Sequence, residues 1–286
     1  MNQQTPPSKA SPLFHVAAQD GCQLRVRTLR SDATGGPPVI FIHALAMNGE
    51  MWVDVVQSMP PGPALYAMDC RGHGDSDKPP GPYTTEQFAN DICAVMDFLG
   101  VSQSHLVGCS MGGTVALAFA GRFPQRVASL CVIDSTACYG KESQPAWEAR
   151  GQRALAEGFE AMVPFQLQRW FSPEYAEREP AGLHAAVKVF LRNHPQAYLE
   201  SCRMLGFADE RPGLSLYTGA ASVVVGQEDY ATPPEMAQTI VTGMAEADLY
   251  VLPGLRHYTP IEAPAEVAKI ITLTMAKFTA AHAKEN

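Results

Sequence analysis

The chain contains 286 residues, of which 46% are apolar, and carries a formal net charge of −8 at pH 7. This length suits one α/β domain with a modest insertion, and the negative charge, without any lysine- or arginine-rich run, argues against a nucleic-acid partner or an anionic membrane surface. The sequence has no signal-peptide pattern and no apolar stretch as long as a membrane span, so we expect a cytoplasmic protein whose oligomeric state stays open.

Apolar runs that are typical of strands alternate with helical patterns after residues 1–12, which are polar and contain prolines and are expected to form a flexible tail. The first two runs predict a hairpin around Asp20-Gly21. Six later strands are expected at residues 38–42, 64–68, 104–108, 128–134, 221–226 and 248–252, with helices between them that include 85–99 and 235–244. This alternation predicts an α/β fold, with a mostly parallel sheet flanked by helices.

The five residues 108–112 read Gly-Cys-Ser-Met-Gly and follow one of these strands directly. A small-residue helical pattern comes after them. A serine between glycines at such a junction is typical of a nucleophile elbow, because the sharp turn exposes the hydroxyl and leaves no room for a neighbouring Cβ. The sequence therefore predicts Ser110 as a nucleophile.

An oxyanion hole in such a site needs two backbone N–H groups that point at the developing charge. One comes from the residue after the nucleophile, and the other from the loop after an early strand. Here these are Met111 and Leu45, the latter in the loop that follows strand 38–42. His43, just before Leu45, is expected to brace the loop.

Residues 137–218 interrupt the alternation of strands and helices after the sixth strand. They contain helix-like segments at 144–157, 159–169, 181–192 and 195–205 and no good strand. We expect this segment to form a helical cap over the site, inserted into a core made of residues 13–136 and 219–286.

A carboxylate and a histidine follow the last two expected strands, in the order that a serine nucleophile of this type requires. Asp229 lies in the loop after strand 221–226, and His257 lies in the loop after strand 248–252. Because the carboxyl ends of parallel strands meet at one edge of a sheet, we expect Ser110, Asp229 and His257 to come together as a catalytic triad.

Two other carboxylates compete with Asp229 for the role of the acid. Asp134 ends strand 128–134 and is a second candidate, whereas Glu228 is adjacent in sequence but is expected to point elsewhere. Asp229 itself, before Thr232-Pro233-Pro234, also fits the cap of the next helix.

The motifs together resemble the α/β-hydrolase superfamily from about residue 20 to the C-terminus. Within it the chain is most similar to 3-oxoadipate enol-lactonases. The resemblance rests on the D-x-R-G-H-G-x-S-D loop at 69–77, the G-x-S-M-G-G elbow at 108–113, the G-R-F-P-x-R-V segment at 121–127, Arg169-Trp170-Phe171, and Asp229 followed by Tyr230. It implies hydrolysis of a small anionic enol-lactone from the breakdown of aromatic compounds.

Two segments depart from the enol-lactonase pattern. Residues 43–46 read His-Ala-Leu-Ala where these lactonases carry Ser and then Gly, and His257 is followed by Tyr258-Thr259-Pro260. Other reactions therefore stay open: cleavage of a carbon–carbon bond in ring-cleavage products, and general carboxylesterase or perhydrolase activity. A non-catalytic ligand receptor on the same fold is a further alternative.

Aromatic and cationic side chains of the expected cap are candidates to contact the substrate. Trp147, Trp170, Phe171 and Phe190 could wall a pocket, although core packing is favoured for most of them. A guanidinium suits a substrate carboxylate, which makes Arg150, Arg153, Arg169 and Arg192 candidates. We single out Arg150, Arg169, Trp170 and Tyr258 as expected substrate-binding residues.

The expected reaction is acyl transfer to Ser110 followed by hydrolysis, with a small-molecule ester or lactone as the only predicted partner. This chemistry requires neither a metal nor an organic cofactor. The seven cysteines lack zinc-ligand spacing and are expected to be free thiols.

Overall fold

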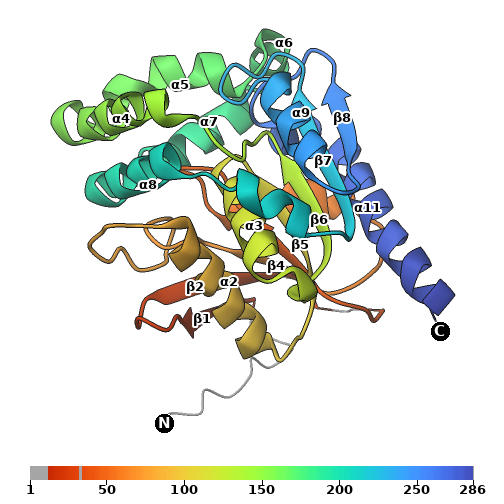
Figure 1. The fold of residues 1–286 in the computed structure, drawn as a ribbon. Coiled ribbons are helices and arrows are strands. Elements are labelled where there is room, and N and C mark those ends of the chain that lie inside the picture. The colour runs from red at the N-terminus through yellow and green to blue at the C-terminus, as the bar shows by residue number, and fades with distance from the viewer. Residues whose placement is uncertain (1–11, 32–33, 286) are drawn as a thin grey trace.

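The computed structural model describes residues 12–31 and 34–285, so the predicted tail lies outside the described residues except for Pro12. An eight-stranded sheet forms the centre, in the order β1-β2-β4-β3-β5-β6-β7-β8 (Figure 1). The strands are β1 (Leu13–Ala17), β2 (Gln23–Arg30), β3 (Val39–Ile42), β4 (Leu65–Met68), β5 (Ser104–Cys109), β6 (Val127–Ile133), β7 (Ala220–Gly226) and β8 (Asp248–Leu252). Only the β1–β2 and β2–β4 pairs are antiparallel, which confirms the predicted mostly parallel sheet.

Helices cover both faces of this sheet, and this explains why its central strands are apolar throughout. Every residue of β3, β5 and β6 is buried, as expected for parallel strands that face helices on both sides. One face packs against α2 (Thr85–Leu99), α3 (Met111–Arg122) and α9 (Pro234–Gly243), and the other against α11 (Pro264–Glu285), on which α1 (Val53–Gln57) packs.

The bounds of α2 agree with the prediction because its end signals are local. Thr84 and Gln87 form a reciprocal capping box at the start, and Gly100 ends the helix with a φ of 71°. Each signal needs only residues within one turn of the helix end, so it can be read from the sequence.

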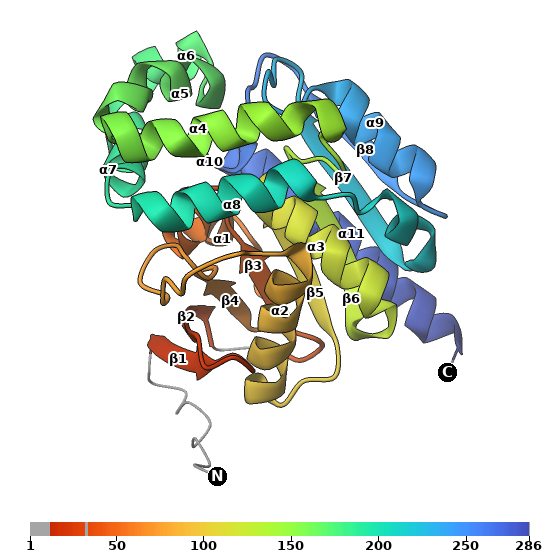
Figure 2. The same cartoon turned by 60° about the vertical axis from the view of Figure 1, so that its left-hand side comes forward.

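The predicted helical insertion lies above the carboxyl edge of the sheet (Figure 2). It contains α4 (Gln144–Glu157), α5 (Val163–Trp170), α6 (Pro173–Arg178), α7 (Pro180–Phe190) and α8 (Pro195–Phe207). The bounds of α4 are those predicted, whereas α6 was not predicted. A readable signal marks α6, because the Ser172 hydroxyl accepts a hydrogen bond from the Tyr175 N–H and Pro173 begins the helix.

Close packing of α4 along α8 joins the helices of the insertion to an apolar core that it shares with the sheet. A Cβ on Gly151 would lie 2.8 Å from the Cα of Leu199, so the two helices approach closely at this point. Phe171 and Phe190 are buried in this core, as favoured from the sequence. Of the described helices, none is both long enough and apolar enough to span a membrane.

Three histidines are buried with no carboxylate of the described residues within ion-pair distance, and burial holds each of them neutral. Burial lowers the pKa of His43 to about 4, that of His105 to about 4 and that of His73 to about 3. His43 accepts a hydrogen bond from the Cys70 N–H at Nε2, over 2.9 Å, and its Nδ1 lies 2.8 Å from the Ala44 carbonyl oxygen. The predicted bracing role of His43 is therefore confirmed.

These histidines should make the protein strongly sensitive to acid. The unfolded chain binds their protons below about pH 6.5, whereas the folded chain does not until about pH 4, so stability is fully present above pH 6.5 and is lost as the pH falls. Around pH 5 these groups should lower the free energy of unfolding by about 3–4 kcal/mol per pH unit.

Urea unfolding between pH 7 and pH 4.5 measures this slope. His105→Gln should reduce the slope by about 1.4 kcal/mol per pH unit, because one of the three groups is removed. His184→Gln is the matched control, since His184 lies exposed on α7, and it should leave the slope unchanged. An equal slope in all three proteins would contradict the assignment.

Candidate active site

The strand-to-helix turn at Ser110 has the strained backbone that an exposed nucleophile requires. Ser110 has φ 54° and ψ −117°, between the last residue of β5 and the first of α3. A Cβ on Gly108 would collide with the Gly112 carbonyl, and one on Gly112 would collide with the Ile42 carbonyl. Only glycine fits at these two positions, and the turn therefore presents the Ser110 hydroxyl above the edge of the sheet.

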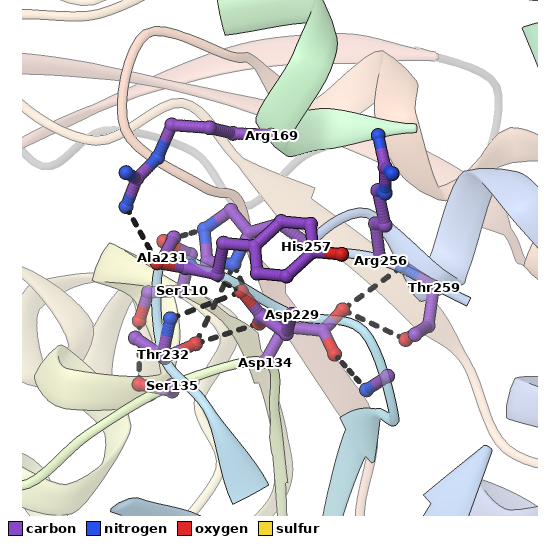
Figure 3. A network of polar contacts seen from close by, with 12 residues as sticks. Ser110, Asp134, Ser135, Arg169, Asp229, Ala231, Thr232, Arg256, His257 and Thr259 are labelled. Carbon is purple, nitrogen blue, oxygen red and sulfur yellow. Dashed lines mark hydrogen bonds and ion pairs between the residues drawn. The ribbon is translucent and has the colours of Figure 1, made fainter. Parts of the chain in front are cut away.

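Ser110, His257 and Asp229 form one continuous chain of hydrogen bonds (Figure 3). The Ser110 Oγ lies 2.8 Å from Nε2 of His257, and Nδ1 of the same ring lies 2.8 Å from Oδ2 of Asp229. The three side chains come from the ends of β5, β7 and β8, as predicted, and all three are buried.

The loop after β7 stabilises the ionised form of Asp229. Its Oδ1 accepts hydrogen bonds from the Ala231 and Thr232 N–H groups, at 2.7 and 3.0 Å, and its Oδ2 accepts one from the Thr232 hydroxyl at 2.8 Å. Burial by itself raises the pKa of Asp229, but the adjacent His257 and these hydrogen bonds lower it below its ordinary value. An ionised Asp229 can hold the imidazole in one tautomer.

The two competing carboxylates do not contact His257. Asp134 accepts hydrogen bonds from the Gly226 N–H and from the N–H and hydroxyl of Thr259, at 3.1, 2.9 and 2.8 Å. Complete burial, together with the nearby Asp229, holds its pKa well above the ordinary value. A carboxylate oxygen of Glu228 lies 3.6 Å from Nε of Arg256, and the Glu228 side chain is partly exposed. Asp134 thus ties the ends of β6 and β7 to the histidine loop.

The two predicted oxyanion amides border the nucleophile. Met111 begins α3, where N–H groups have no partner within the helix, and Leu45 lines the same cavity as Ser110. Among the described residues, neither amide donates a hydrogen bond to another backbone group. The loop of Leu45 is held from above, because Nδ2 of Asn193 donates to the Ala46 carbonyl at 2.8 Å.

A cavity of about 420 Å³ opens above the Ser110 hydroxyl, between the sheet edge and the helical insertion. This volume suits a small ligand. All four predicted substrate-binding residues line it, namely Arg150, Arg169, Trp170 and Tyr258. Trp147 and Arg153 line it as well. Arg192 does not line it; Arg192 is exposed and borders a separate, smaller pocket together with Asn48 and Asp75.

Arg150 places a positive charge in this cavity without a carboxylate partner among the described residues. Its Nε donates to the Tyr198 hydroxyl at 2.8 Å and its Nη2 to Oε1 of Gln166 at 3.3 Å. The guanidinium lies 5.0 Å from the ring centre of Trp147. By contrast, Arg153 is neutralised by Glu157 at 2.8 Å. The charge on Arg150 is therefore available to an anionic ligand.

The sequence interpretation missed several residues that line the cavity or support the site. Tyr139, Met162 and Gln166 line the cavity, and Thr232 supports Asp229. Met162, Gln166 and Arg169 recur at helical spacing, so the helical pattern offered a signal once Arg169 had been singled out. No sequence signal marked Thr232, because its hydrogen bond to Asp229 depends on the turn of the loop.

Comparison with known proteins agrees with this geometry. Residues 37–201 match the family model described as the alpha/beta hydrolase fold. The chain is 29% identical to 3-oxoadipate enol-lactonase 2 of Acinetobacter baylyi, over 93% of this chain and 99% of that protein. It is 26% identical to 2-hydroxymuconate semialdehyde hydrolase of Pseudomonas sp. strain CF600, over 86% and 89%.

Among solved structures, the enol-lactonase from Burkholderia xenovorans LB400 superposes with a TM-score of 0.86 and 28% sequence identity. The superposition covers 92% of this chain and 100% of that one. The family model spans more than half of the chain, and the sheet order and the predicted fold agree with it. The chain therefore belongs to the α/β-hydrolase family.

Proposed function

We propose that the chain is a serine hydrolase that cleaves a carboxylic ester or lactone through an acyl-enzyme. The observation that carries this proposal is the hydrogen-bonded chain from Ser110 through His257 to Asp229, whose Ser110 hydroxyl lies at the cavity beneath the insertion. A nucleophile, a base in contact with it and an orienting carboxylate are the components that acyl transfer needs.

The proposed mechanism has two steps. His257 takes the Ser110 proton at Nε2 as Oγ attacks the substrate carbonyl, and Asp229 stabilises the resulting imidazolium through Nδ1. The amides of Leu45 and Met111 stabilise the oxyanion, and His257 returns the proton to the leaving oxygen. Water then attacks the acyl-enzyme by the same route, so that a carboxylate is released and Ser110 regains its proton.

The proposed substrate is a small anionic enol-lactone of the kind formed when aromatic compounds are broken down. The Arg150 guanidinium in the cavity, which has no carboxylate partner in the part of the chain that the structure describes, supports an anionic substrate. Resemblance to two enol-lactonases over more than nine-tenths of this chain supports the lactone. We also propose that the helical insertion, residues 137–218, acts as the cap that determines this specificity.

Hydrolysis of a substrate panel tests the proposal. The panel contains an enol-lactone with a carboxylate, neutral aryl esters, an acyl-homoserine lactone and a ring-cleavage dienoate. We expect the highest kcat/KM for the anionic lactone, and an acyl adduct on the peptide that contains Ser110 after acid quenching. Preference for the dienoate would favour carbon–carbon cleavage instead, and would draw the chain closer to the relative from Pseudomonas sp. strain CF600 that is named 2-hydroxymuconate semialdehyde hydrolase. Turnover at the wild-type rate in Ser110→Ala would overturn the acyl-enzyme mechanism.

Substitution of Arg150 by glutamine should separate binding of the anion from the chemistry. A hydrogen bond to a charged group contributes about 1.5–3 kcal/mol, so KM for the anionic lactone should rise by about 10- to 100-fold. Turnover of a neutral aryl ester should change by less than about threefold, because no charge has to be bound.

Arg192→Gln is the matched control, since it removes a guanidinium of the same insertion that lies outside the cavity. Its kcat and KM for both substrates should equal those of the wild type. If Arg150→Gln lowers kcat/KM equally for the neutral and the anionic substrate, Arg150 supports the cap rather than binding the substrate carboxylate.

A further inference from the structure

Glu262 is a buried carboxylate that holds two distant backbone segments at once. It ends α10 (Thr259–Glu262) and is 5% exposed. Its Oε1 accepts a hydrogen bond from the Arg256 N–H and its Oε2 accepts one from the Ser172 N–H, both at 2.8 Å. Among the described residues it has no cationic partner within ion-pair distance. Each oxygen of the carboxylate therefore accepts one of these two backbone N–H groups.

The two amides belong to the histidine loop and to the helical insertion. Arg256 immediately precedes His257, and Ser172 lies two residues after Trp170, which lines the cavity. Further hydrogen bonds join the same two segments. The Tyr258 N–H donates to the Trp170 carbonyl at 3.1 Å, and Nη1 of Arg256 donates to the carbonyls of Gln168 and Phe171 at 2.7 and 3.1 Å.

The backbone on both sides of His257 is consequently held by the insertion. The residue before it is held through Glu262, and the residue after it is held directly by Trp170. Stacked side chains also connect the insertion to His257. Trp170 stacks on Tyr258 with ring centroids 5.1 Å apart, and Tyr258 stacks on His257 with centroids 5.5 Å apart. Placement of the imidazole opposite Ser110 thus depends on contacts with the insertion as well as with the sheet.

We propose that Glu262 is a positioning residue that couples the cap to the histidine loop and so sets the distance between His257 and Ser110. This inference rests on the proposed serine-hydrolase function. A carboxylate is required because each oxygen accepts one N–H. Glutamine offers one acceptor oxygen and one NH₂ group, and the NH₂ group would face an N–H donor and lose that link.

The first test replaces Glu262 by glutamine and measures catalysis on two substrates. A small displacement of a catalytic group costs up to about a hundredfold, so kcat should fall by about 10- to 100-fold for both the anionic lactone and a neutral aryl ester. KM should change by less than about threefold, because the cavity side chains remain. Glu266→Gln is the matched control on the adjacent α11, where the glutamate is exposed, and should behave like the wild type.

A second test removes the link from the side of the cap. Ser172 has φ −66° and ψ 152°, and Phe171 has φ −126° and ψ 145°, so proline fits at 172 without changing the backbone. Ser172→Pro removes the N–H that Glu262 accepts together with the hydroxyl, whereas Ser172→Ala removes the hydroxyl alone. We expect Ser172→Pro to lower kcat as Glu262→Gln does, and Ser172→Ala to retain most of it.

A purely structural role would change stability without changing the reactivity of Ser110. Each folded variant is therefore also reacted with diethyl 4-nitrophenyl phosphate, which needs the activated serine but not the carboxylate contacts of the cavity. Glu262→Gln and Ser172→Pro should be phosphorylated at least about tenfold more slowly than the wild type. Wild-type rates in either variant would overturn the positioning role, whereas absence of labelling in the wild type would instead overturn the proposed function.

Discussion

Substitution of Ser110 by alanine should lower kcat by about 10⁴- to 10⁶-fold while the protein stays folded. The loss is large because the covalent route disappears, and what remains is the weaker effect of the oxyanion hole and of substrate binding. The fold should tolerate the change, because alanine retains the Cβ that the turn already accommodates at φ 54°. Stopped assays at high enzyme concentration, with the anionic lactone and an aryl ester, measure the residual rate.

Ser102→Ala is the control for this experiment, since Ser102 is exposed and lies in the loop before β5. It should show wild-type turnover after the same purification, so that a loss of activity in Ser110→Ala is specific to the removal of this hydroxyl. Retention of more than about one hundredth of the wild-type kcat in Ser110→Ala would overturn the assignment of the nucleophile. Such a result would favour a mechanism in which His257 activates a water molecule that attacks the substrate carbonyl.

Substitution of Asp229 by asparagine should lower kcat by about 10³- to 10⁴-fold. An amide NH₂ facing Nδ1 favours the tautomer that carries its proton on Nε2, and this tautomer cannot accept the Ser110 proton. The substitution also removes the negative charge that stabilises the imidazolium. The Thr232 hydroxyl, 3.4 Å from Nδ1, lacks a charge and cannot replace that effect. A pH profile of kcat/KM and the binding of a substrate analogue separate this loss from weaker binding.

Asp134→Asn distinguishes the two carboxylates that the sequence left as candidates. Asp134 contacts Gly226 and Thr259 and does not contact the imidazole, so its substitution should lower kcat by less than about tenfold. The substitution should instead lower the free energy of unfolding by about 1–3 kcal/mol. The asparagine NH₂ group cannot accept the hydrogen bonds that a carboxylate oxygen accepts from the buried donors of Gly226 and Thr259. A larger catalytic loss in Asp134→Asn than in Asp229→Asn would reverse the assignment of the acid.

Agreement between sequence and structure is best where the signal lies in neighbouring residues. The capping box of α2, the glycines around Ser110 and the apolar runs of the strands each depend on a few adjacent positions. Because parallel strands bring their carboxyl ends to one edge, the order of Ser110, Asp229 and His257 along the chain was sufficient to predict that these side chains meet.

The sequence by itself therefore determined the strands, the elbow and the candidate triad, since local sterics and hydrophobic periodicity are encoded in short segments. Only the tertiary structure decided that Asp134, the second candidate acid, binds Gly226 and Thr259 instead of His257, that Arg150 lines the cavity while Arg192 lies outside it, and that Glu262 joins Arg256 to Ser172. These outcomes depend on packing between segments that are distant in the chain, such as Ser172 and Glu262, which are 90 residues apart. Periodicity identifies a buried helix face, but the partner of a side chain on that face is set by long-range packing.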